Sequence, residues 1–130
     1  MTYDANRIAI QNHVISNWTT TPIIHDSAEA ATHQDEWVRL RFADLRSDQA
    51  SIGGAAVKYR HFGILIIEIY VTEQSGSGKA TRYGDTLAAL FRGETVGDAL
   101  FRAPVVRQIG RDEGWYRVNV EIPFQRDECF

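Results

Sequence analysis

A glycine-rich segment that ends in a lysine is the first candidate for chemistry in this sequence. Gly76-Ser77-Gly78-Lys79 follows a strongly apolar run and precedes a helical pattern, and backbone amides at the start of a helix bind phosphate groups. The segment departs from the P-loop pattern at two positions. Glu73 stands where that pattern has its first glycine, and Ala80 stands where it has the Ser or Thr that binds magnesium. We therefore interpret the segment as a connection between a strand and a helix.

The other residue types that support catalysis or metal binding are scattered along the chain. Cys129 is the one cysteine, so it has no partner for an internal disulfide or a metal site. No Gly-x-Ser-x-Gly segment frames a nucleophilic serine. The histidines, which lack the close spacing of zinc ligands, are His13, His25, His33 and His61. We predict no catalytic residue, no metal and no cofactor, and we expect a protein that is not an enzyme.

Glu68 is the one charged residue in the most apolar run of the chain, Ile64 to Val71. This run shows almost no alternation, so both of its faces must be covered, and we predict that it forms the central strand of a sheet. A carboxylate inside such a strand needs a cationic partner. We expect an arginine of a neighbouring strand to be that partner. A catalytic carboxylate is the alternative, but no second acid is placed to share acid and base work.

Two amphipathic helices are expected from apolar residues that recur at about 100° per residue. The first spans residues 4–18, with Asp4 or Thr2 as its N-cap. Its apolar side is formed by Ile8, Ile10, Val14, Ile15 and Trp18. The second helix spans residues 79–91, with Ser77 as its N-cap and Gly93 as its stop.

Strands are expected where residues alternate between apolar and polar, and where apolar runs are short. The predicted strands cover residues 37–42, 55–62, 64–71, 100–109 and 115–124. Residues 23–25 are expected to form a strand or an extended arm. We expect a bend at Gly63 and an edge or bulge at Pro104. Residues 27–35 are interpreted as a surface loop or a weak helical turn, and residues 49–54 as a linker.

The order of these elements predicts an α+β fold with a mostly antiparallel sheet of about five to six strands and two helices packed on one face. Residues 1–130 are expected to form a single domain, because the chain is too short for a second core. Two helices cover only one face of such a sheet. The other face must therefore stay in contact with water or be buried against another subunit.

The strand patterns place arginine and tryptophan side chains together on that second face. Arg39 and Arg41 alternate with apolar residues, and Trp37, Trp115 and Arg117 have the same parity. Tryptophan and arginine are enriched at protein contact sites, so one hypothesis is that this face binds another subunit or a partner. An ordinary solvated sheet face with aromatic residues at its margin fits the pattern equally well.

A second candidate interface is the loop that we expect over residues 73–78. It includes Ser75, Gly76, Ser77 and Gly78. We expect this loop to be mobile in a free subunit and to become ordered on contact with a partner.

The overall charge of the chain argues against several classes of function. The formal charge is −3, with 14 basic and 17 acidic residues mixed along the sequence, whereas proteins that bind nucleic acid are usually basic. We therefore expect no sequence-specific nucleic-acid binding. The longest apolar stretch, residues 63–71, is too short for a membrane-spanning helix, and the first residues do not resemble a signal peptide.

Five segments, read in order, resemble a known family of phage proteins. They are Trp37–Leu40, Tyr59–Leu65, Ser75–Gly78, Asp85–Gly93 and Trp115–Phe124. They are similar to segments of small proteins from phage and prophage tail-gene clusters, which resemble the tail terminators (tail-completion proteins) of lambda-like phages. The resemblance covers most of the chain and depends on the order and spacing of the segments.

The resemblance implies an α+β subunit of the virion tail that is made in the cytoplasm of the bacterial host. Such a subunit forms a homo-oligomer, a hexameric ring, on the finished tail tube. It ends polymerisation of the tube and provides the surface for head-tail joining. The implied partners are the tail tube protein and a head-tail connector protein. One alternative is another head-tail connector or minor tail protein, and an alternative of a different class is a small ligand-binding domain or enzyme that uses the cleft between the second helix and the sheet.

Overall fold

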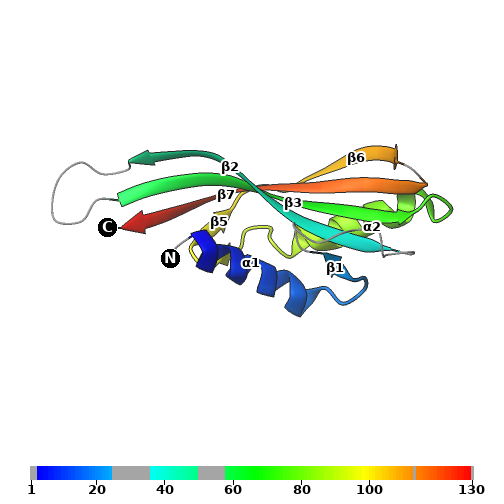
Figure 1. The fold of residues 1–130 in the computed structure, drawn as a ribbon, viewed down its shortest axis with the longest axis horizontal. Helices are drawn as coiled ribbons and strands as arrows, with labels where there is room; N and C mark the ends of the chain where they lie inside the picture. Colours follow the sequence, from blue (N-terminus) through cyan, green and yellow to red (C-terminus); the bar gives the residue numbers. More distant parts are fainter. Residues whose placement is uncertain (1–2, 25–35, 50–57, 113, 130) are drawn as a thin grey trace.

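The computed structural model describes residues 3–24, 36–49, 58–112 and 114–129. In chain order the elements are α1 (Tyr3–Asn17), β1 (Ile23–Ile24), β2 (Trp37–Gln49), β3 (Lys58–Thr72), α2 (Gly76–Ala89), β4 (Thr95–Val96), β5 (Ala99–Phe101), β6 (Val105–Asp112) and β7 (Trp115–Cys129). Two helices lie against one curled sheet (Figure 1). This arrangement confirms the predicted α+β fold.

The sheet is built around the two longest strands, β3 and β7. In the described part it has seven strands in the order β1-β2-β3-β7-β5-β4, and β6 also pairs with β7. β1 runs parallel to β2, and every other pair is antiparallel. β3 lies between β2 and β7, as its continuous apolar run predicts. β7 is paired with β3 on one side and with β5 and β6, one after the other, on the other side.

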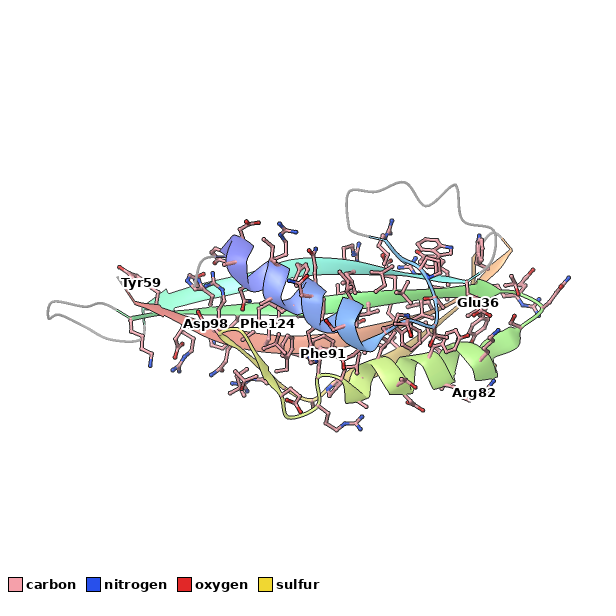
Figure 2. All side chains as sticks on the ribbon, turned by 90° about the horizontal axis from the view of Figure 1, so that it is seen from below. Glu36, Tyr59, Arg82, Phe91, Asp98 and Phe124 are labelled. Atoms are coloured by element: carbon pink, nitrogen blue, oxygen red, sulfur yellow. The ribbon has the colours of Figure 1, made fainter. Side chains whose placement is uncertain are left out.

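Both helices cover the same face of the sheet (Figure 2). α1 contributes the buried residues Ile10 and Val14, and α2 contributes Ala80 and Leu87. Alternate residues of the central strands complete this core, among them Leu65, Ile67, Ile69, Val118, Val120 and Ile122. Because side chains alternate along a strand, the same strands present their other residues to the opposite face, which we call the outer face.

α2 packs closely on β6 and β7 through a glycine. A Cβ added at Gly84 would lie 3.1 Å from Val106 Cγ1 and 3.5 Å from Val118 Cγ1. At this position the second helix and the sheet are therefore in direct contact.

The two strands predicted on either side of Gly63 are one strand. β3 continues through this residue, and the ring of Phe124 lies over it on the neighbouring strand. A Cβ at Gly63 would lie 2.7 Å from Phe124 Cζ and 3.2 Å from the carbonyl oxygen of Ala43. Glycine is therefore required here because an aromatic ring and a backbone approach it closely.

The predicted strand over residues 100–109 is also wrong, because it consists of two strands. β5 ends at Phe101 and β6 begins at Val105. Pro104 lies between them and has no N–H to continue the ladder. Strands β2 and β7, by contrast, extend past their predicted ends at Phe42 and Phe124.

The apolar side of α1 is only partly buried. Ile8 and Ile15 are 43% and 46% exposed, although the helical pattern places them on the apolar side. Asp4 lies inside the helix instead of capping it, while Thr2 lies outside the described residues. The predicted loop over residues 27–35 and most of the linker over residues 49–54 also lie outside the described residues.

Candidate functional site

The five strand residues predicted to share a face come together on the outer face of the sheet. Trp37 and Arg39 of β2 lie opposite Tyr70 and Glu68 of β3 in the ladder. From the other side of β3, Arg117 of β7 is registered with Tyr70 and Trp115 with Thr72. We call Trp37, Arg39, Arg41, Trp115 and Arg117, with Glu68 and Tyr70 between them, the Arg–Trp cluster.

Glu68 is the electrostatic centre of the Arg–Trp cluster and is 1% exposed. Arg39 Nε donates a 2.8 Å hydrogen bond to Glu68 Oε1, and Arg117 Nη2 donates a 2.5 Å hydrogen bond to Oε2. Arg41 Nε lies 3.9 Å from Oε1. The predicted pairing of Glu68 with arginines of neighbouring strands is confirmed. Bonds from two charged donors offset much of the cost of burying the carboxylate.

The aromatic residues of the Arg–Trp cluster pack mainly on one another. The rings of Trp37 and Tyr70 are stacked, with centroids 3.9 Å apart and planes 5° apart, and Trp115 meets Trp37 edge-on at 6.2 Å. Trp37 is only 4% exposed. Trp37, a candidate contact residue, is therefore largely covered by other residues of the same chain. The accessible part of the cluster consists of Trp115 and the three arginines.

Arg41 is the most accessible arginine of the cluster, with 43% of its side chain exposed, against 26% for Arg39 and 21% for Arg117. Three guanidinium groups thus surround one buried carboxylate. Arg107 and Glu121 form a separate pair on the adjacent strands, with 2.8 Å between Nε and Oε2. A partner that contacts the cluster meets arginine donors first, and such donors suit carboxylate groups of another protein.

The predicted loop over residues 73–78 is wrong in its second half. Gly76, Ser77 and Gly78 form the first turn of α2, which begins three residues before its predicted start. Ser75, rather than Ser77, precedes the helix, and its N–H bonds to the carbonyl of Thr72 at 3.0 Å. Glycine has a low helix propensity, so the sequence pattern did not predict this helical turn. Gly76, with φ of +79°, supplies a left-handed residue where the chain enters the helix.

The remaining residues of this segment are held beside the β6–β7 hairpin. Glu73 N–H bonds to the carbonyl of Gly114 at 3.2 Å, and its carboxylate lies 3.4 Å from Arg111 Nε. Of the predicted loop, only residues 73–75 lie outside α2. Ordering of this segment on contact with a partner stays a prediction.

Lys79, the lysine of the motif that resembles a P-loop, forms an ion pair with Glu36. Tyr83 donates a 2.6 Å hydrogen bond to Glu36 Oε2. Burial raises the pKa of Glu36, but the bonds from Lys79 and Tyr83 together outweigh it and lower this pKa below its usual value. Lys79 thus joins α2 to the start of β2, which supports a structural role for the motif. No local sequence pattern pointed to Glu36 as the partner of Lys79, because the two residues lie far apart in the chain.

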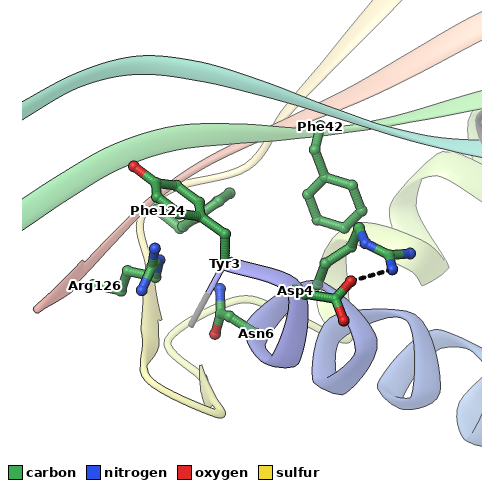
Figure 3. Close-up of a pocket in the computed structure, with 7 residues that line it drawn as sticks. Tyr3, Asp4, Asn6, Phe42, Phe124 and Arg126 are labelled. Atoms are coloured by element: carbon green, nitrogen blue, oxygen red, sulfur yellow. Dashed lines mark hydrogen bonds and ion pairs between the residues drawn. The ribbon is translucent and has the colours of Figure 1, made fainter. Parts of the chain in front are cut away.

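A cavity of about 310 Å³, which is not among the sites predicted from the sequence, lies between the first turns of α1 and the sheet (Figure 3). Its lining includes Tyr3, Asp4, Asn6, Phe42, Phe124 and Arg126. One signal was present in the sequence. Along β7 the apolar alternation that ends at Phe124 reaches Arg126 at the next inward position, and Arg126 is 1% exposed.

Within the described residues, no group of three or more His, Cys, Asp and Glu side chains is placed to hold a metal ion. Neither of the two described helices is long and apolar enough to cross a membrane.

Comparison with known proteins identifies a shared architecture. No protein-family model matches the chain, and no curated protein matches its sequence. A solved structure of a protein whose name states no activity is similar to it with a TM-score of 0.69 and 16% sequence identity, over 97% of this chain and 96% of that one. At this identity the likeness establishes a common α+β fold over nearly the full length of both chains. A shared fold does not by itself imply a shared function.

Proposed function

We propose that this chain is a structural virion protein that caps a phage tail tube as a hexameric ring, ends polymerisation of the tube and provides the surface that joins the head. Five segments between Trp37 and Phe124 resemble segments of tail terminators in their order and spacing, and this resemblance supports the proposal. The observation that carries it is the exposure of large apolar side chains on two separate parts of the subunit.

The first apolar surface lies on α1. Ile8 and Ile15 are seven residues apart, or about two helical turns, so they lie on the same side of the helix. The second surface lies on β5 and β6, where Leu100, Val105 and Ile109 are 45%, 46% and 44% exposed. A head-to-tail ring needs two different surfaces on every subunit, each fitting the other. α1 and the β5–β6 margin are suited to that arrangement.

Open edges of the sheet support the same proposal. Within the described residues, β6 pairs with β7 alone, and β1 covers only Val38 and Arg39 of β2. Among the described residues, no other strand pairs with the rest of this edge of β2 or with the outer side of β6, so a neighbouring strand could bond to their backbone N–H and C=O groups. In a ring, each neighbour would bury an edge that otherwise invites unspecific aggregation.

The Arg–Trp cluster supports a contact with a further protein of the virion. Its accessible guanidinium groups lie on a rigid part of the sheet, because Glu68 and the stacked Trp37 and Tyr70 hold them in place. We assign this surface to an acidic region of the tube or of the connector protein. In this proposal the Arg–Trp cluster binds partners outside the ring, and the apolar surfaces bind neighbouring subunits.

Deletion of the gene tests the proposed role directly. In the phage or prophage that encodes this chain, we expect a deletion to yield tail tubes of uncontrolled length that do not join heads, as seen by electron microscopy. A wild-type copy supplied on a plasmid should restore tails of normal length. Normal virions from the deletion strain would refute the role in tail completion.

Substitutions on α1 test the ring. The double variant Ile8→Glu, Ile15→Glu should fold, because both side chains are already exposed, but it should not complement the deletion or form rings in electron micrographs. Ser16→Glu is the matched control, since Ser16 is an exposed position of the same helix. We expect this control to complement fully. Rings formed by the double variant would show that α1 is not a subunit contact.

A further inference from the structure

Two of the three elements that border the cavity of Figure 3, α1 and β7, each place a polar residue in an apolar pattern. On α1 the buried positions recur every four residues, at Asn6, Ile10 and Val14. On β7 the inward positions continue through Phe124 to Arg126. Asn6 is 3% and Arg126 is 1% exposed, and both line the cavity. Burying an amide and a guanidinium is costly unless something bonds to them.

The amide of Asn6 points to the chemistry of a ligand. Its Oδ1 atom is buried and has no hydrogen-bond partner in the described part of the chain. An asparagine amide presents an acceptor beside an NH₂ donor, in either of its two orientations. The group that satisfies it best is a planar edge with a donor beside an acceptor. A molecule that offers only acceptors would leave one atom of this amide unpaired.

Arg126 supplies a donor on the same cavity. Its guanidinium carbon lies 4.0 Å from the centroid of the Tyr3 ring. A guanidinium has five N–H donors, so it can donate to a carbonyl in the cavity while it keeps other contacts. Asp98 and Asp127 border a second cavity that also touches Arg126. With these carboxylates close by, a second anion is a poorer match for Arg126 than a neutral carbonyl.

The charges at the cavity itself lead to the same conclusion. Asp4 and Arg7 both line it, and Arg7 Nη2 donates a 2.5 Å hydrogen bond to Asp4 Oδ1. The opposite charges of Asp4 and Arg7 cancel, so this pair does not favour a charged ligand.

The walls and the size of the cavity suit one aromatic ring. Phe42 and Phe124 offer ring surfaces, and the hydroxyl group of Tyr3 is engaged with His61 Nδ1 at 2.8 Å. A volume of about 310 Å³ corresponds to roughly ten water molecules and lies at the lower end of small-molecule sites. We propose that this cavity binds a small, neutral aromatic molecule whose edge carries an N–H donor beside a carbonyl acceptor, as an aromatic carboxamide does.

Titration of the isotopically labelled protein with benzamide, followed by NMR, tests the proposal. We expect saturable shifts of the side-chain NH₂ signal of Asn6 and of the Nε–H signal of Arg126. Acetophenone has the same shape without the donor, and benzoate has two acceptors with a charge. Both should bind about tenfold more weakly than benzamide, because each leaves Asn6 Oδ1 unpaired. Equal or tighter binding of either analogue, or shifts confined to another region, would overturn the proposal.

Three variants complete the test. Asn6→Leu removes the amide and fills part of the cavity, so it should abolish benzamide binding and raise the melting temperature. Arg126→Met should weaken binding about tenfold. Arg60→Met is the control, because Arg60 lies at the same end of the sheet and pairs with Asp127 but does not line the cavity. Unchanged affinity in either cavity variant would refute the site. The measurements use the isolated subunit, so their outcome does not depend on the role proposed for the tail.

Discussion

Replacing Glu68 by glutamine should unfold the protein at a much lower temperature. The substitution keeps the shape of the side chain and removes the one buried charge to which Arg39 and Arg117 donate at 2.8 and 2.5 Å. Their guanidinium groups would then face each other across a neutral amide. Breaking a buried ion pair from one side costs about 3–5 kcal/mol. Because the arginines are 26% and 21% exposed, water screens part of the repulsion, and we expect the lower end, about 3 kcal/mol.

A loss of that size is large for a domain with a total stability of about 5–15 kcal/mol. It should lower the melting temperature by roughly 10 °C, as measured by circular dichroism, and urea titration should give the same loss of free energy. Raising the salt concentration should recover part of it, because ions screen the two arginines from each other. Glu121→Gln is the matched control on the same face of the sheet. Its partner Arg107 is 57% exposed, so the loss should be about 0–1 kcal/mol.

The double variant Glu68→Gln, Arg117→Gln should recover part of the loss, since it removes one of the two repelling charges. If Glu68→Gln costs no more than Glu121→Gln, the Arg–Trp cluster is not held together by its central carboxylate. The assignment of a rigid basic contact surface would then lose its physical basis.

Three further substitutions have defined outcomes. Gly63→Ala should destabilise the protein by about 1–3 kcal/mol in urea titrations, because the ring of Phe124 must move from an atom that would lie 2.7 Å away; an unchanged midpoint would contradict that contact. Gly78→Ala should stabilise it by about 0.5 kcal/mol, since alanine favours the first turn of α2, whereas a loss of stability would show that this turn is not helical. The hydrogen bond from Arg60 is the main cause that lowers the pKa of Asp127 from 3.8 to about 2. Stability supplied by this carboxylate is therefore present above pH 4 and should be lost as the pH falls from about 4 to about 2. In Asp127→Asn this component of the acid denaturation curve should be absent.

Alternation along the strands made the outer face predictable from the sequence. A period of two fixes which residues share a face once a strand is paired, so the grouping of Arg39, Trp115 and Arg117 follows from local pattern alone. The pairing of Glu68 with arginine followed from burial, because a charge in a strand that is covered on both faces has few other solutions.

The ends of the strands depended on contacts that the sequence does not display. Residues 125–129 of β7 are mostly polar, and ion pairs with β3 help to hold them, such as Arg60 Nε to Asp127 Oδ1 at 2.9 Å. Likewise, the helical pattern of α1 predicts an apolar side but not which of its residues pack against the sheet. The exposure of Ile8 and Ile15 could therefore not be predicted from the sequence. The cavity was missed because its two polar residues, Asn6 and Arg126, come from opposite ends of the chain.

The position of β7 in the sheet determines when this fold can form. β3, β5 and β6 are all joined through it, yet residues 115–129 follow all three of these strands in the chain. Helix α1 and strands β1 to β3 are synthesised earlier but have only part of their core until β7 arrives. Long-range pairing of this kind slows folding. The surfaces formed by β5 and β6 therefore cannot take their final shape before β7 has been synthesised.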